Sequence, residues 1–173
     1  MARRLRNLVI HCTATPEGRE VYADDIRRWH LSPVSRGGRG WKQVGYTDLI
    51  HLDGHIERLV DNNEDAWVDP WEITNGAKGY NAVSRHVVYA GGLASDAKTP
   101  CDTRTPEQRA AMAGYVRSFH KRFPGVRIVG HRDLSPDRNG DGKISRNEWL
   151  KDCPCFDVAA WLREIGINQE EDL

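Results

Sequence analysis

The sequence predicts a single α/β domain, residues 1–173, in which helices flank a central mixed β-sheet. Short apolar runs suited to buried strands alternate with segments of helical periodicity, and this order is typical of α/β domains. The chain has 173 residues with 39% hydrophobic content, which is enough for a proper core. An acidic loop at residues 137–148 is inserted into this pattern.

The first half of the chain predicts a strand, a helix and a hairpin. Residues 7–12 are apolar and predict a buried strand. Residues 22–31 have apolar side chains at helical spacing, with Asp24 as the expected cap of a short amphipathic helix. Asp53 and Gly54 form a strong hairpin-turn signal. The two strands that this turn joins are expected within residues 41–52 and at residues 55–60.

The second half predicts two more strands and two helices after a long polar loop at residues 61–79. The best helix signal begins at Thr105, a capping residue that is followed by a proline at the first helical position and a glutamine three residues on. The expected strands are residues 85–89 and 126–130, and the expected helices are residues 105–123 and 157–165.

Charge and composition exclude several classes of protein. The 25 basic and 25 acidic residues give a formal net charge of zero, which speaks against general electrostatic binding to nucleic acid or membranes. The apolar run near the N-terminus is too short for a signal peptide or a membrane span. Four cysteines in a chain of this length do not resemble a disulfide framework. We therefore expect a monomer made in the cytoplasm of a bacterium.

The acidic loop matches the calcium-binding loop of an EF-hand at every constrained position. Alternate side chains on such a loop point at a common centre, a glycine at position 6 permits the sharp turn, and a glutamate at position 12 closes the site. The predicted calcium ligands are Asp137, Asn139, Asp141, Lys143 (through its carbonyl), Ser145 and Glu148. A proline before the loop disfavours the usual entering helix, so only residues 146–152 could be helical. The alternative is a solvated surface turn.

Two histidines end predicted strands, and a cysteine pair follows the acidic loop. If neighbouring strands place His11 and His131 at one sheet edge, Cys153 could complete a three-ligand site. Zinc accepts nitrogen and sulfur ligands, and catalytic zinc sites keep a fourth position for water. On the residues alone, three unrelated side chains are an equally good interpretation.

The order of six motifs resembles a known family. IHCTATPEGR, a Gly-Tyr pair before an apolar strand and Asp-Gly, KGYN, YAGG, GHRDLSPD and KDCPCFDV occur as in zinc-dependent N-acetylmuramoyl-L-alanine amidases of type 2. That family includes phage lysozyme-type amidases and is similar to the peptidoglycan recognition proteins. The resemblance covers residues 7–165. It implies an enzyme that binds bacterial peptidoglycan and hydrolyses the amide between N-acetylmuramic acid and L-alanine of the stem peptide.

The resemblance also implies roles for individual residues. His11, His131 and Cys153 would bind zinc, and Cys153 is preferred to Cys155 because the family's cysteine stands directly before a proline. Tyr46 matches the family's catalytic tyrosine, and Lys151 matches a lysine associated with hydrolysis in the phage-type members.

This sequence departs from the family pattern around the expected substrate contacts. Thr47 and Asp48 follow the Gly-Tyr pair, where an aromatic residue or histidine is usual, and Gly76 stands where the family often has a histidine. These departures bear on the substrate contacts around Tyr46 and Asn81. Trp67 and Trp71, in the polar loop, are either walls of a glycan-binding groove or local packing anchors.

Two other classes of protein remain as alternatives. Recognition proteins that lack the cysteine bind peptidoglycan without cleaving it, and Cys153 argues against that class here. A calcium-regulated interaction protein would need paired helices around the loop. Within the enzyme class, we expect a phage or prophage endolysin, with a wall-recycling amidase or an antibacterial effector as alternatives.

Overall fold

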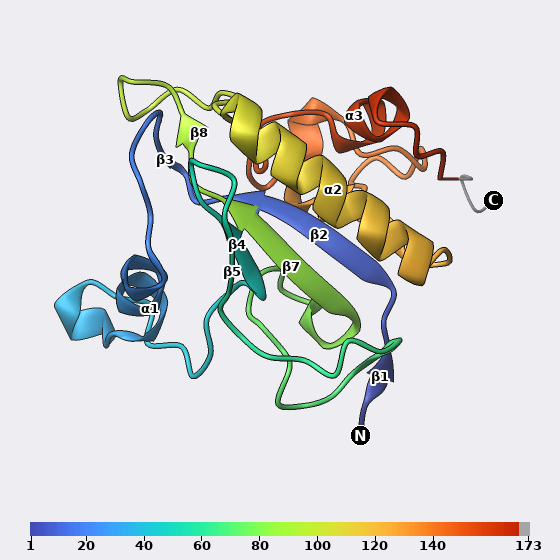
Figure 1. Ribbon diagram of the computed structural model, residues 1–173, viewed down its shortest axis with the longest axis horizontal. Helices are drawn as coiled ribbons and strands as arrows, with labels where there is room; N and C mark the ends of the chain where they lie inside the picture. The colour runs from blue at the N-terminus through green and yellow to red at the C-terminus, as the bar shows by residue number, and fades with distance from the viewer. Residues whose placement is uncertain (170–173) are drawn as a thin grey trace.

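The computed structural model describes residues 1–169 and contains one five-stranded sheet (Figure 1). The outer pair of strands is antiparallel and the remaining pairs are parallel, which makes the sheet mixed, as predicted. In spatial order the strands are β5 (Ile56–Arg58), β4 (Asp48–Ile50), β7 (Ser84–Tyr89), β2 (Asn7–Cys12) and β9 (Arg127–Gly130).

The two central strands, β2 and β7, are buried along their whole length. Parallel strands that are covered on both faces read as apolar runs, which is why the sequence signal at residues 7–12 was strong. Successive side chains point to opposite faces. Leu8 and Ile10 therefore pack on one face, whereas Val9 and His11 point to the other.

Helices cover both faces of the sheet. The core on one face joins β2 and β7 to α2 (Pro106–Arg122) and α3 (Val158–Glu164) through side chains that include Met112, Val116 and Trp161. The core on the other face joins Leu49 and Val88 to α1 (Ala23–Leu31). Figure 1 shows α2 running across the sheet and α1 on the other side of the sheet from α2. Among the described residues, no helix combines the length and the apolar character needed to cross a membrane.

Short elements complete the structure. β1 (Arg3–Arg4) pairs with β6 (Trp67–Val68), and β3 (Thr15–Pro16) pairs with β8 (Gly92–Leu93). The single-turn 3-10 helices are η1 (Val34–Arg36), η2 (Asn81–Val83), η3 (His131–Leu134) and η4 (Arg146–Glu148).

Several predicted boundaries and caps need correction. The cap of α1 is Tyr22, and Asp24 instead accepts a hydrogen bond from Arg27 within the first turn. The polar loop at residues 61–79 contains β6, because its backbone pairs with β1. Residues 146–152 contain only the short η4. The cap at Thr105 is confirmed, since its hydroxyl accepts from the backbone N–H of Gln108.

Candidate metal centre

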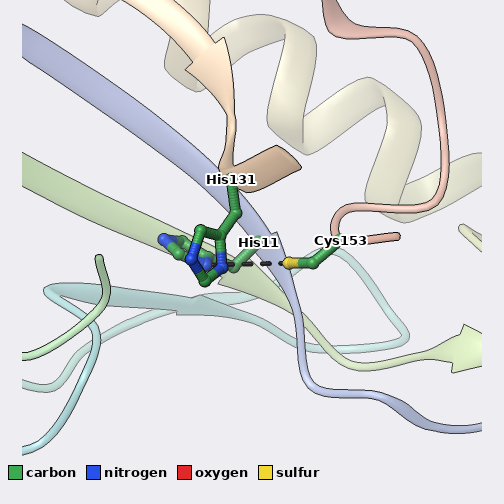
Figure 2. A group of neighbouring side chains, drawn as sticks. All are labelled: His11, His131 and Cys153. Carbon is green, nitrogen blue, oxygen red and sulfur yellow. Dashed lines mark hydrogen bonds between the residues drawn. The ribbon is translucent and has the colours of Figure 1, made fainter. Parts of the chain in front are cut away.

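His11, His131 and Cys153 come from separate segments and meet at one edge of the central sheet. His11 lies near the end of β2, His131 begins η3, and Cys153 lies between η4 and α3. Their ligand-capable atoms all lie within 4.8 Å of one another; within residues 1–169, this is the one such group of three or more histidine, cysteine or acidic residues. Figure 2 shows the three side chains converging.

Strand register brings the two histidines together. β2 and β9 run parallel, with Ile10 opposite Gly130. One residue further along each strand places His11 beside His131, and the centroids of the two rings are 4.7 Å apart. His11 is buried and His131 is half-buried. The expectation that two strand ends would bring these side chains to one sheet edge is met in the geometry.

Hydrogen bonds hold Cys153 beside the histidines. The backbone N–H of Cys12 donates to Cys153 Sγ at 3.3 Å. On the other side, the backbone N–H of Arg132 donates to the Cys153 carbonyl oxygen at 2.8 Å. Cys153 Sγ lies 3.7 Å from His11 Nδ1. Cys153 is therefore anchored to the residues that directly follow His11 and His131.

Both histidines of the cluster are held in the neutral form. Burial lowers the pKa of His11 well below its usual range, and neighbouring histidines add to the effect. Burial, with a further contribution from the positive charge of Lys151, lowers the pKa of His131 to about 4. A neutral imidazole has a free lone pair on one ring nitrogen, so both rings can act as metal ligands at neutral pH.

A third histidine, His86, lies directly behind the cluster. Its Nδ1 is 3.0 Å from His11 Nε2, and its ring is completely buried. Burial lowers the pKa of His86 to about 3. From the sequence, residues 85–89 are expected only to form a strand. One signal could have identified His86: it is a histidine within an apolar strand, and its side chain points to the same face of the sheet as that of His11 in β2.

Gly76 explains how this histidine fits. A Cβ atom at position 76 would lie 2.4 Å from His86 Nδ1 and 2.6 Å from the Gly45 carbonyl oxygen. The absence of a side chain at this position is therefore a packing requirement of the His86 ring.

Tyr46 and Lys151 both line the cavity that borders the cluster. The Tyr46 ring centroid is 5.2 Å from that of His11, and burial raises the pKa of the Tyr46 hydroxyl above its usual value. The next residue, Thr47, points away from the cavity: its hydroxyl accepts from the backbone N–H of His86 at 3.3 Å. Thr47, which departs from the family pattern, therefore forms a hydrogen bond to β7, whereas Tyr46 lies beside the cluster.

The cavity has a volume of about 800 Å³ and its lining is aromatic and basic. Most of its aromatic and basic side chains are not among the predicted site residues, because they come from separate segments of the chain. The aromatic residues are Trp29, Trp41, Tyr46 and Tyr80, and the basic residues other than histidine are Arg19, Arg39, Lys78 and Lys151. Asp152 is the acidic residue of the lining.

The proposed substrate residues lie elsewhere. Trp67 and Trp71 are about half exposed and do not line the cavity. Trp67 belongs to β6, which pairs with β1 just before the start of β2. His11 lies near the opposite end of β2. Asn81 also lies outside the lining, but its side-chain oxygen accepts from the backbone N–H of Ala77, which does line the cavity. Asn81 thus supports one wall.

The acidic loop is folded around its own backbone. Asp137 accepts from the N–H groups of Gly140 and Gly142, and Asp141 accepts from that of Lys143. The carboxylate of Glu148 accepts four hydrogen bonds, which come from the N–H groups of Arg138, Asn139 and Ser145 and from the Ser145 hydroxyl. These bonds lower the pKa of Glu148 to about 2. Within residues 1–169, the loop carboxylates do not form a cluster of the kind formed around Cys153.

Cys155, the other cysteine of the pair, packs beside Cys12. The two Sγ atoms are 3.7 Å apart, and the Cys155 thiol donates to the Gly92 carbonyl oxygen at 3.2 Å. Its backbone lies in the left-handed region, with φ 73°. Cys155 is thus adjacent to the three-residue cluster without belonging to it.

The chain matches a protein family model and several related proteins. The family described as N-acetylmuramoyl-L-alanine amidase matches residues 1–147. An endolysin of Enterobacteria phage K11 is 31% identical over 155 residues, which cover 89% of this chain and 83% of the relative. An uncharacterised protein of Haemophilus influenzae is 43% identical over 91 residues, which cover 53% of this chain and 78% of the relative.

Solved structures share the fold at low sequence identity. The Ph2119 endolysin from a bacteriophage of Thermus scotoductus has a TM-score of 0.63 and 20% identity, and the match covers 95% of this chain and 87% of that one. Bumblebee peptidoglycan recognition protein SA has a TM-score of 0.60 and 16% identity, with coverages of 92% and 81%. These likenesses concern the arrangement of the α/β domain.

Proposed function

This chain belongs to the N-acetylmuramoyl-L-alanine amidase family and is a peptidoglycan hydrolase, and we propose that it works with a zinc ion held by His11, His131 and Cys153. The bond cleaved is the amide between the lactyl group of N-acetylmuramic acid and L-alanine of the stem peptide. The observation that carries this proposal is the convergence of three ligand-capable atoms within 4.8 Å at the wall of the cavity.

The donor set fits zinc. Two neutral imidazoles and one thiol supply nitrogen and sulfur, the ligands that zinc prefers, and a catalytic site uses three protein ligands with one position left open. All three residues line the cavity, so the open position has room for a substrate. Bound zinc would supply Lewis-acid chemistry: it polarises a carbonyl group and lowers the pKa of water at the site.

Tyr46 and Lys151 are proposed to assist the reaction from the same cavity. Because burial raises the pKa of Tyr46, its hydroxyl stays protonated and can donate a hydrogen bond to the carbonyl oxygen as negative charge develops there. Lys151 brings a positive charge close enough to depress the pKa of His131. The same charge stabilises an oxyanion or helps a proton reach the leaving amine.

The experiment that tests this function combines metal analysis with product analysis. We expect about one zinc per chain in the purified protein, and new L-alanine amino termini when the protein is incubated with peptidoglycan. Zinc without new alanine termini would point to recognition without cleavage or to another amide. Alanine termini produced by protein that contains no zinc, in the presence of a chelator, would refute the metal assignment.

The biological role proposed is that of a phage or prophage endolysin. The support is the match to a phage endolysin over 83% of that protein's length. We treat residues 1–173 as one catalytic domain that acts on the cell wall as a monomer. A recycling amidase would prefer soluble wall fragments, so comparing turnover on intact sacculi with turnover on muropeptides separates the two roles.

A separate proposal concerns calcium in the loop at residues 137–148. The support is the ligand spacing together with the exposed side chains of Asp137, Asn139 and Asp141. Bidentate binding by Glu148 would require it to exchange some of its four present hydrogen bonds for the ion. Added calcium should then raise the melting temperature of the zinc-loaded protein, and magnesium should not. Equal melting curves with and without calcium would refute this proposal.

A further inference from the structure

His86 and His11 form a buried pair on neighbouring parallel strands. Val9 lies opposite His86 and His11 lies opposite Val88, so the two histidines are diagonal neighbours on the same face. His86 Nδ1 is 3.0 Å from His11 Nε2, and their ring centroids are 5.1 Å apart. This contact uses the ring nitrogen of His11 that faces away from Cys153.

The geometry determines which nitrogen carries a proton when a metal is bound. His11 Nδ1 faces the thiol of Cys153 at 3.7 Å and is therefore the nitrogen directed at the ligand cluster. A ring nitrogen that ligates a metal has no proton, so the proton of neutral His11 sits on Nε2. That N–H must donate to His86 Nδ1, which places the proton of His86 on its own Nε2. The opposite polarity would put a proton on His11 Nδ1 and prevent ligation.

His86 is held firmly in the position that this hydrogen bond needs. Its backbone N–H donates to the Thr47 hydroxyl, and its carbonyl oxygen accepts from the Thr47 N–H at 2.8 Å. Gly76 lies against the ring, where a Cβ would approach Nδ1 to 2.4 Å. The ring thus occupies a space from which a side chain at position 76 is excluded.

A packing role alone does not account for a histidine here. Within the described residues, His86 Nε2 is buried without a hydrogen-bond partner. An unpaired buried polar atom is costly, and an apolar side chain of similar size would avoid that cost. The one side-chain hydrogen bond of His86 is made by its Nδ1, and its partner is His11, a member of the cluster. This bond gives the histidine a role that an apolar side chain could not fill.

We propose that His86 is a positioning residue that accepts a hydrogen bond from His11 Nε2 and thereby fixes the tautomer and orientation of His11 for metal binding. Gly76 is the residue that makes room for it. This inference rests on the proposed zinc site. Partners that orient metal-binding histidines in this way typically account for about 10–100-fold in metal affinity.

The test compares zinc affinities of purified zinc-loaded protein and three variants by competition with a chromophoric chelator. His86→Phe keeps the ring volume without an acceptor, and His86→Asn places an amide oxygen near the position of Nδ1. Val87→Ala is the matched control, because Val87 is equally buried on the same strand but packs on the opposite face. We expect about 10–100-fold weaker zinc binding for His86→Phe, recovery in His86→Asn, and unchanged affinity in Val87→Ala despite its lower stability.

A second measurement needs no variant. In zinc-loaded protein labelled with ¹⁵N at histidine, we expect a proton on His11 Nε2 and scalar coupling across the hydrogen bond to His86 Nδ1. A proton on His86 Nδ1, or wild-type zinc affinity in His86→Phe, would overturn the inference. Wild-type protein that binds no zinc at all would instead refute the proposed function, and the inference would fall with it.

Discussion

The cluster of His11, His131 and Cys153 and the loop at residues 137–148 both present metal-ligand types at informative spacings, yet they differ in what surrounds them. The cluster draws its members from three segments and leaves their ligand atoms facing one another beside a cavity. The loop draws all its members from twelve consecutive positions, and its carboxylates are satisfied by nearby N–H groups. Ligand spacing along a chain is therefore weaker support for a metal site than the convergence of ligand atoms from distant segments.

The largest effect expected from a single substitution is that of Cys153→Ser. Loss of the thiol should release zinc, and losing several kcal/mol of transition-state stabilisation should lower kcat/KM by about 1,000-fold or more. Elemental analysis and release of alanine termini measure the two effects. The control is Cys155→Ser, which removes a neighbouring thiol outside the cluster. Loss of zinc in Cys155→Ser but not in Cys153→Ser would mean that the cluster has been assigned to the wrong cysteine.

Tyr46→Phe should have the next largest effect. Removing one hydrogen-bond donor to a developing oxyanion costs on the order of 100–1,000-fold in kcat. Zinc content should be unchanged, because the Tyr46 hydroxyl is not among the ligands. Lys151→Ala should act in the same direction. Full activity of both variants on cell walls would remove these two residues from the mechanism.

Glu148→Gln tests whether the loop at residues 137–148 affects stability alone or also the reaction at the cluster. The loss of a charged acceptor of four hydrogen bonds should lower the melting temperature by a few degrees, while kcat measured at 25 °C should stay near the wild-type value. Differential scanning calorimetry and the alanine-release assay separate the two quantities. A drop in kcat at unchanged melting temperature would show that the loop takes part in the reaction.

The smallest effect concerns pH and His30. The neutral ring of His30 accepts a hydrogen bond from the Gly45 N–H, and burial, aided by the charges of Arg39 and Lys151, lowers the pKa of His30 to about 4. Between about pH 6.5 and 4, the unfolded chain binds a proton at His30 that the folded chain does not. The contribution of His30 to the free energy of unfolding should therefore be fully present above about pH 6.5, and it should be lost as the pH falls to about 4.

The size of this contribution is about 1–2 kcal/mol once solvent screening is allowed for. Urea denaturation of metal-free protein at several pH values measures it. Other buried histidines titrate with the same sign, so the informative quantity is the difference between wild type and His30→Gln. Identical pH profiles would mean that the pKa of His30 is the same in the folded and unfolded states.

Much of the fold could be predicted because its signals are local. The central strands are continuous apolar runs, and the cap of α2 is a capping box at Thr105 and Gln108. The hairpin between β4 and β5 follows from Asp53 and Gly54. The cap of α1 was misassigned because Asp24 and Asp25 are both plausible acceptors, and only the backbone geometry places Tyr22 at the boundary.

The site was predictable only in part, for a physical reason. Motif order pointed to His11, His131 and Cys153, and the parallel register of β2 and β9 brings the two histidines together. His86 was missed because its relevance depends on a diagonal contact between strands 75 positions apart in the chain. The tryptophans of the cavity wall, Trp29 and Trp41, were missed because their place in the wall depends on tertiary packing, whereas Trp67 and Trp71 drew attention through composition alone.

The base of the acidic loop has a practical consequence for protein engineering. The Ser135 hydroxyl accepts from the backbone N–H of Leu150 at 3.0 Å, and Arg132 binds the Cys153 carbonyl oxygen, so the two chain segments are clamped together below the loop. Doubling the length of a closed loop costs only about 0.6 kcal/mol of chain entropy. The exposed tip of the loop is therefore a suitable site for inserting a foreign peptide, because the two hydrogen bonds at its base keep Cys153 beside the histidines.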